Sequence, residues 1–174
     1  VAWKTRDAAL SAARAVGERL AAIYAEVAER SMRDLPIFNP KLRVEAVGFH
    51  DDGRRVLGIV LTPWFMNAVV AASPLGPAAP AAPFGATVVY DLPSGSYDFL
   101  VGEVAGFGRL DSLSLFSPVF EFDDPEVALA TAEAAMAELR RPPEPDTPEP
   151  APRQALDRRA LLFGRRPRSE ASPS

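Results

Sequence analysis

The chain contains no cysteine and only one histidine, His50, among its 174 residues. The absence of cysteine excludes disulfide bonds, thiolate zinc sites, cysteine-held iron–sulfur clusters and cysteine nucleophiles. A single histidine leaves few ligands for a transition-metal site. We therefore expect neither a metal nor any other cofactor, and the lack of thiols fits a reducing compartment.

Long apolar runs are also absent. No stretch approaches the roughly 20 residues that a membrane-spanning helix needs. Residues 1–20 include acidic side chains and lack a compact apolar segment, so they do not resemble a secretory signal. We expect a cytoplasmic protein without direct membrane insertion. The formal net charge of −4 gives no general reason to expect nucleic-acid binding.

The length predicts one domain with tails. We assign residues 1–141 to a single α+β domain and residues 142–152, which hold six prolines, to an extended linker. Residues 153–167 form an arginine-rich apolar motif. Residues 168–174 are polar and are expected to be disordered.

Helical signals occur in three places. Residues 6–30 carry an amphipathic stripe spaced by four, three and four residues, formed by Val16, Leu20, Ile23 and Val27. A short central helix over 63–71 is predicted from a capping Thr62 followed by a proline. A third helix begins at Asp124, which we expect to cap it, and ends before Pro142.

Strand signals fall into two groups. Residues 43–49 and 55–62 predict a hairpin whose second strand has apolar residues on both faces. Residues 86–91, 96–104 and 109–117 predict a meander with tight turns. The fold class is therefore α+β, with an antiparallel sheet of about five strands covered by helices and followed by a proline-rich tail.

A proline-rich segment separates the two groups of strands. Its prolines fall at 74, 77, 80 and 83, which is the three-residue repeat of polyproline II. We interpret the segment as a stiff surface loop in preference to a partner-binding motif.

Candidate catalytic groups are sparse. His50 stands beside Asp51 and Asp52 at a predicted hairpin tip, where it is either a polar turn residue or half of a catalytic relay. The enzyme alternative combines His50 with Asp51 or Glu103, and it requires a polar pocket that joins them. No nucleophile motif accompanies these residues, so we favour a non-catalytic protein.

Two apolar segments are candidates for binding a partner. Trp64, Phe65 and Met66 are consecutive, and on a helix all three cannot face one core. The alternative is that the first helix or the proline-rich loop covers them.

The second segment lies near the C-terminus, where arginines bracket three large apolar side chains. Its candidate binding residues are Leu161, Leu162, Phe163, Arg165 and Arg166. An equal alternative is that this segment packs against its own domain. It is too short, and too far from the N-terminus, to be a twin-arginine export signal.

Four stretches resemble the HybE/HupJ family of nickel–iron hydrogenase assembly chaperones. They are "ERSMRDLPIFNP" at 29–40, "LTPWFMNAVV" at 61–70, "YDFLVGEVAGFGRLDSLSLFSP" at 97–118 and "RRALLFGRR" at 158–166. The resemblance implies a non-catalytic chaperone that binds an immature subunit of a membrane-bound uptake hydrogenase before twin-arginine export. The small-subunit precursor is the favoured partner, and the oligomeric state is left open.

Overall fold

The computed structural model describes residues 2–145. Residue 1 and residues 146–174 lie outside the described part. The arginine-rich motif and the polar end expected from the sequence therefore also lie outside it, as does most of the proline-rich linker.

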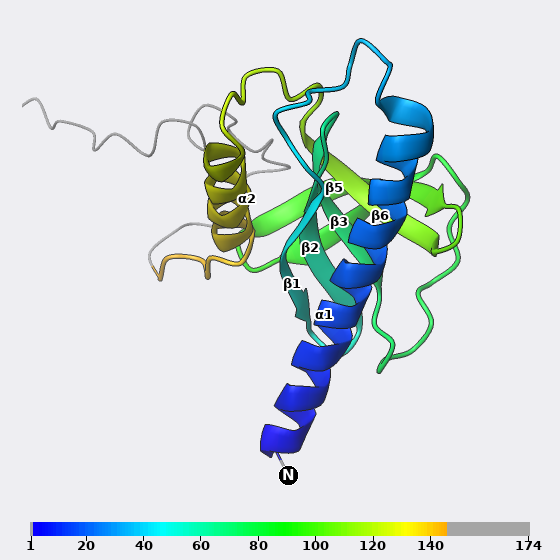
Figure 1. The fold of residues 1–174 in the computed structure, drawn as a ribbon. Helices are drawn as coiled ribbons and strands as arrows, with labels where there is room; N and C mark the ends of the chain where they lie inside the picture. The colour runs from blue at the N-terminus through cyan, green and yellow to red at the C-terminus, as the bar shows by residue number, and fades with distance from the viewer. Residues whose placement is uncertain (1, 146–174) are drawn as a thin grey trace, which may run out of the picture.

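The long N-terminal helix is confirmed. Helix α1 spans Ala2–Val27 and continues into a π-helical turn, η1, at Ala28–Met32. Its buried residues are Ala13, Val16, Gly17 and Leu20, which pack on the sheet. The first three turns carry no buried residue and project beyond the sheet at the lower end of Figure 1.

A six-stranded antiparallel sheet forms the centre of the domain, in the order β1-β2-β3-β6-β5-β4. The strands are β1 (Glu45–Asp51), β2 (Arg55–Leu61), β3 (Met66–Ala72), β4 (Thr87–Leu92), β5 (Gly95–Val104) and β6 (Gly108–Phe116). Figure 1 shows α1 crossing one face while helix α2, Pro125–Leu139, packs at the other side. The α+β class, the hairpin and the meander are confirmed.

The predicted central helix is wrong, because the segment forms strand β3. Thr62 caps a turn: its Oγ1 accepts hydrogen bonds from the backbone N of Trp64 at 3.2 Å and of Phe65 at 2.9 Å. The backbone N of Thr62 donates to the Phe65 carbonyl at 2.8 Å, which closes a tight link between β2 and β3. The sheet consequently has six strands instead of five.

Both faces of the sheet are covered near its centre. On the α2 side the core includes Ile59, Met66, Phe99 and Phe122. On the α1 side it includes Leu20, Val56, Val60 and Val69. Strand β2 contributes to both clusters, as its two apolar faces predicted.

Helix α2 begins and ends as the sequence predicts. The Asp124 side chain accepts a hydrogen bond from the Glu126 backbone N at 2.8 Å, and a proline occupies the first helical position. At the other end, the Leu139 carbonyl accepts from Ser94 Oγ at 3.0 Å, in the turn between β4 and β5. Among the described helices, none combines the length and apolarity required to span a membrane.

Candidate functional site

The first predicted docking segment is largely built into the fold. Trp64 is 7% exposed and Met66 is fully buried. The Tyr24 ring of α1 meets Trp64 and Phe65 edge-on, with centroids 6.3 and 5.4 Å apart, and Phe38 stacks near Trp64 at 6.4 Å.

The first helix therefore covers Trp64 and Phe65, whereas Met66 packs in the core on the α2 side. Phe65 alone retains an intermediate exposure. Trp64 and Met66 stabilise the fold, and a partner could contact them directly only after displacing neighbouring side chains.

The predicted His50 site is not assembled as a relay. Asp51 is buried, and it accepts hydrogen bonds from the Gly53 backbone N and from Ser73 Oγ, both at 2.7 Å. Asp52 accepts from the backbone N of Arg54 and of Arg55, both at 2.9 Å. Both carboxylates thus hold the β1–β2 turn.

Glu103 lies on the exposed surface, and neither it nor His50 lines the cavity described below. Burial, with a smaller contribution from Arg140, lowers the pKa of His50. The pocket that the enzyme alternative required is not formed by these residues.

The second predicted docking segment, with Leu161, Leu162, Phe163, Arg165 and Arg166, lies outside the described residues. Its binding role stays a prediction.

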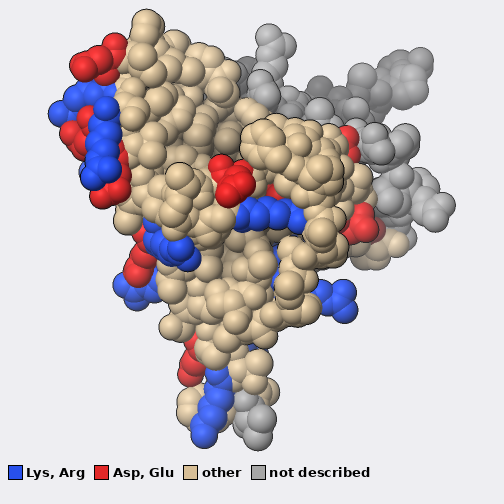
Figure 2. All heavy atoms as spheres, turned by 90° about the vertical axis from the view of Figure 1, so that its right-hand side faces the viewer, with Lys and Arg blue, Asp and Glu red and all other residues tan. Residues whose placement is uncertain are grey.

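A cavity that the sequence did not indicate lies beneath the proline-rich loop. Its volume is about 1200 Å³. Its lining comes from α1, the proline-rich loop, the β1–β2 and β5–β6 turns and strands β2, β3, β4 and β6. Four arginines and three aspartates contribute: Arg19, Arg54, Arg55, Arg109, Asp52, Asp91 and Asp111. Figure 2 shows the surrounding face as mostly uncharged, with both basic and acidic side chains across its middle.

Asp111 is the centre of a polar cluster at one wall of this cavity. It is 1% exposed and accepts from Arg109 Nε at 2.9 Å, Arg109 Nη2 at 2.8 Å and the Tyr90 hydroxyl at 2.7 Å. Burial, helped by the Asp111 carboxylate, raises the pKa of Tyr90 to about 12. The remaining Arg109 nitrogen, Nη1, donates to the Pro80 carbonyl at 2.5 Å and so ties the loop to the sheet.

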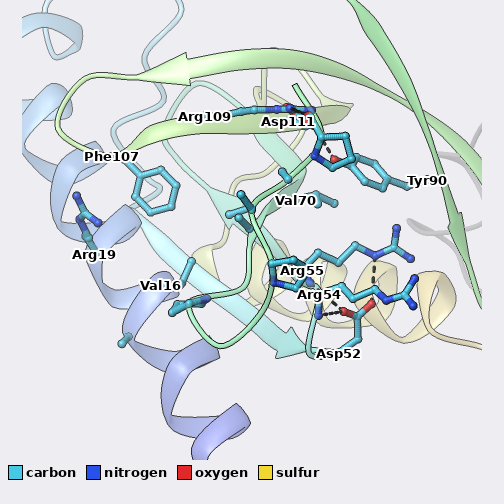
Figure 3. A pocket seen from close by; sticks show the side chains of 18 of the residues that line it. Val16, Arg19, Asp52, Arg54, Arg55, Val70, Tyr90, Phe107, Arg109 and Asp111 are labelled. Atoms are coloured by element: carbon cyan, nitrogen blue, oxygen red, sulfur yellow. Dashed lines mark hydrogen bonds and ion pairs between the residues drawn. The ribbon is translucent and has the colours of Figure 1, made fainter. Parts of the chain in front are cut away.

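Arg55 organises the opposite wall. Its Nε donates to Asp52 at 3.2 Å, its Nη2 donates to the Asp91 carbonyl at 2.7 Å, and its guanidinium lies 5.1 Å from the centre of the Tyr90 ring. Figure 3 shows the Arg54–Arg55–Asp52 group across the cavity from Arg109 and Asp111.

Sequence reasoning missed this site for a physical reason. Its lining residues come from eight segments between α1 and β6, and none of them forms a known chemical motif. The one local signal was the Arg109–Asp111 pair, because residues two apart share a face of a strand. Within the described residues, no group of three or more histidine, aspartate or glutamate side chains is placed to hold a metal ion.

Comparison with known proteins gives a consistent result. The family model described as "[NiFe]-hydrogenase assembly, chaperone, HybE" matches residues 15–164. The chain is 47% identical to the hydrogenase expression/formation protein HupJ of Bradyrhizobium diazoefficiens, over 85% of this chain and 87% of that protein. It is 39% identical to the protein HoxT of Cupriavidus necator, over 80% and 83% of the two chains.

A solved structure shows the same fold. The solution structure of HybE from Escherichia coli superposes with a TM-score of 0.58 at 31% sequence identity, covering 87% of this chain and 90% of that one.

Proposed function

Because the chain belongs to the HybE family of [NiFe]-hydrogenase assembly chaperones, we propose that it binds an immature subunit of a membrane-bound nickel–iron uptake hydrogenase. The binding takes place in the cytoplasm, before twin-arginine export of the folded enzyme. The favoured partner is the small-subunit precursor, and the chain performs no catalysis itself.

The observation that carries this proposal is the extent of the family match. It runs from residue 15 to residue 164, so it includes the packed part of α1, the whole sheet, α2 and the Leu161–Phe163 segment beyond them. A match over both the domain and this segment supports a role in which the two act together.

The arrangement of the polar groups supports a binding role over catalysis. Asp51 and Asp52 are engaged in the β1–β2 turn, and Asp111 is paired with Arg109 and accepts a hydrogen bond from Tyr90. An acid or base catalyst must instead reach the proton that it transfers.

Leu161, Leu162 and Phe163, with Arg165 and Arg166, are the proposed contact to the subunit. Burial of each large apolar side chain contributes about 1.5–3 kcal/mol, and ordering the segment offsets part of that gain. The resulting affinity is moderate, which suits a chaperone that must release its partner. Phe65 remains a secondary candidate because it is the least buried member of its segment.

Co-production tests the proposal. The tagged chain is produced together with either the small or the large hydrogenase subunit, each with and without an export leader, and the captured subunit is quantified. We expect capture of the small-subunit precursor. Capture of neither subunit would refute the proposed function, and equal capture of a mature, assembled enzyme would refute its specificity for the immature form.

A variant lacking residues 153–174 separates the two roles of the C-terminal segment. Loss of capture with an unchanged melting temperature supports a partner contact. A large drop in melting temperature supports packing of the segment on its own domain instead.

A further inference from the structure

Strand β4 is an edge of the sheet, and within the described residues it pairs only with β5. The backbone N of Val101 on β5 donates to the Ala86 carbonyl at 2.8 Å, just before β4 begins. Backbone polar groups of an antiparallel strand alternate in direction from residue to residue. Those of Val88, Tyr90 and Leu92 therefore face β5, and those of Thr87, Val89 and Asp91 face outward.

One outward group is already engaged, which confirms the direction. The Asp91 carbonyl accepts the hydrogen bond from Arg55 Nη2. The outward N–H and C=O groups of Thr87 and Val89 are not paired with another described strand. An edge of this kind is a template for adding a further strand.

This edge faces the cavity. Val89, Tyr90 and Asp91 line one side of it, and Pro74, Pro77 and other loop residues line another side. Figure 3 shows the loop running between the Arg109–Asp111 wall and the Arg54–Arg55 wall.

The loop is fixed in place at its start and near its middle. Gly76 lies so close to the Gly53 carbonyl that an added Cβ would stand 2.3 Å from that oxygen. Arg109 holds the Pro80 carbonyl. The space between the loop and the strand is therefore a preformed slot, which lowers the entropy cost of binding.

Apolar side chains are exposed beside the slot. Val89 is 49% exposed, and Leu100 on β5 is 53% exposed. Leu100 lies opposite Thr87, so it occupies the same face of the sheet as Val89. Phe84, at the end of the loop, is 79% exposed. An added strand would find apolar contacts as well as backbone partners.

The charge at the slot favours carboxylates. Asp111 and Asp52 are matched by Arg109 and Arg55. Arg54 makes no side-chain hydrogen bond or ion pair with the described residues, and Arg19 meets a carbonyl and an aromatic ring instead of a carboxylate. Two arginines at the cavity are thus left without an acidic partner in the described structure. They face one aspartate without a cationic partner among the described residues, Asp91, whose carboxylate accepts from Ser96 Oγ, so the lining carries one net positive charge.

We propose that the β4 edge and the adjoining cavity bind an extended segment of a partner polypeptide as an added strand, and that this segment carries aspartate or glutamate. The inference deepens the proposed function and rests on it, because the partner is the immature hydrogenase subunit. An incompletely folded subunit can present such an extended segment, whereas its folded form pairs the same backbone groups internally.

A pair of substitutions at one position tests the strand addition. Val89→Pro removes the outward N–H without touching the β4–β5 hydrogen bonds, and edge strands tolerate proline at such positions. Val89→Ala keeps the N–H and removes more apolar area than the proline variant does, so it controls for the loss of apolar contact. Overlapping 12-residue peptides that cover both subunits of the hydrogenase are arrayed and probed with each labelled protein.

We expect the wild-type chain to bind a few peptides that contain acidic residues, with at least a tenfold loss for Val89→Pro and a loss below threefold for Val89→Ala. Arg54→Glu should weaken the acidic peptides selectively. Equal binding by the two Val89 variants, or binding that ignores the acidic residues, would overturn the proposal. If Val89→Pro does not fold, Thr87→Pro and Thr87→Ala form an equivalent pair.

The chain's own residues 146–174 are the competing occupant. A tenfold gain in peptide binding when they are removed would assign the slot to them and overturn the proposal. Capture of the whole subunit distinguishes failure of the strand-addition proposal from failure of the proposed function. If Val89→Pro and Val89→Ala capture it equally, the slot fails while the proposed function stands, and if the wild-type chain captures no subunit, the function itself fails.

Discussion

Asp111 is the most deeply buried charged residue of the cavity wall, and its partners determine how much it stabilises the fold. A buried carboxylate is tolerated only when it is paired and hydrogen-bonded. Arg109 and Tyr90 together supply three donors. No sequence pattern could predict the Tyr90 contact, because it joins an edge strand to β6 across the intervening β5.

Replacing Tyr90 with phenylalanine removes one of these donors. We expect the free energy of unfolding to fall by about 1.5–3 kcal/mol, the range for a hydrogen bond to a charged group. Tyr97→Phe is the matched control, because its hydroxyl meets the neutral Ser94 Oγ at 2.8 Å, and a smaller loss of about 0.5–1.5 kcal/mol is expected there. Urea denaturation measures both, and equal losses would argue against a special role for Asp111.

His50 gives the fold a pH dependence of known sign. Its pKa is lowered in the folded chain, from an ordinary value of 6.5, chiefly by burial. Above that value His50 is neutral in both states and has no effect. As the pH falls below it, the unfolded chain takes up the proton more readily, so stability decreases until the folded-state pKa is passed.

We therefore expect the melting temperature of the wild-type chain to fall more between pH 7.5 and pH 5.5 than that of His50→Gln. Thermal denaturation of both proteins at the two pH values, at matched ionic strength, measures these changes in melting temperature. Parallel changes in the two proteins would show that other groups dominate this range.

At the scale of elements, the sequence predicted a helix or strand correctly where the residues that specify it lie close together in the chain. Helix α2 was predictable because Asp124 and the following proline act within one turn. Strand β3 was not, because it lies between β2 and β6 and is buried on both faces. A strand covered on both faces shows no alternation, so its apolar run cannot be told from a short buried helix.

The packing of α1 on the β1–β2 hairpin depends on two glycines. A Cβ added at Gly58 on β2 would lie 2.4 Å from the Phe49 ring, and one added at Gly17 on α1 would lie 3.0 Å from the same ring. The ring thus fills the space that the two glycines leave between helix and sheet. Helix and hairpin approach closely as a result.

Gly58→Ala should destabilise the domain by about 1–3 kcal/mol, the usual effect of overpacking. In a Phe49→Leu background the same change should cost less, because the smaller side chain vacates part of the space. Chemical denaturation of the wild-type chain, the two single variants and the double variant gives the coupling free energy between positions 49 and 58. Additive effects would contradict the contact.

For the whole molecule, the sequence predicted the class, the two groups of strands and the long helix, because periodicity and turn residues act locally. It did not predict the cavity or the slot, because those depend on how the proline-rich loop folds back over β4 and β6. Arg109 and Pro80 are 29 residues apart, and only the folded chain brings them together. The family resemblance supplied the functional expectation that local chemistry could not.

We propose that this chain recognises an immature hydrogenase subunit in preference to the mature enzyme. The most direct test is a titration of the labelled chain with the purified small-subunit precursor and, separately, with the mature assembled hydrogenase. We expect saturable binding to the precursor and binding at least tenfold weaker to the mature enzyme. Equal affinity for the two, or no binding to the precursor, would contradict it.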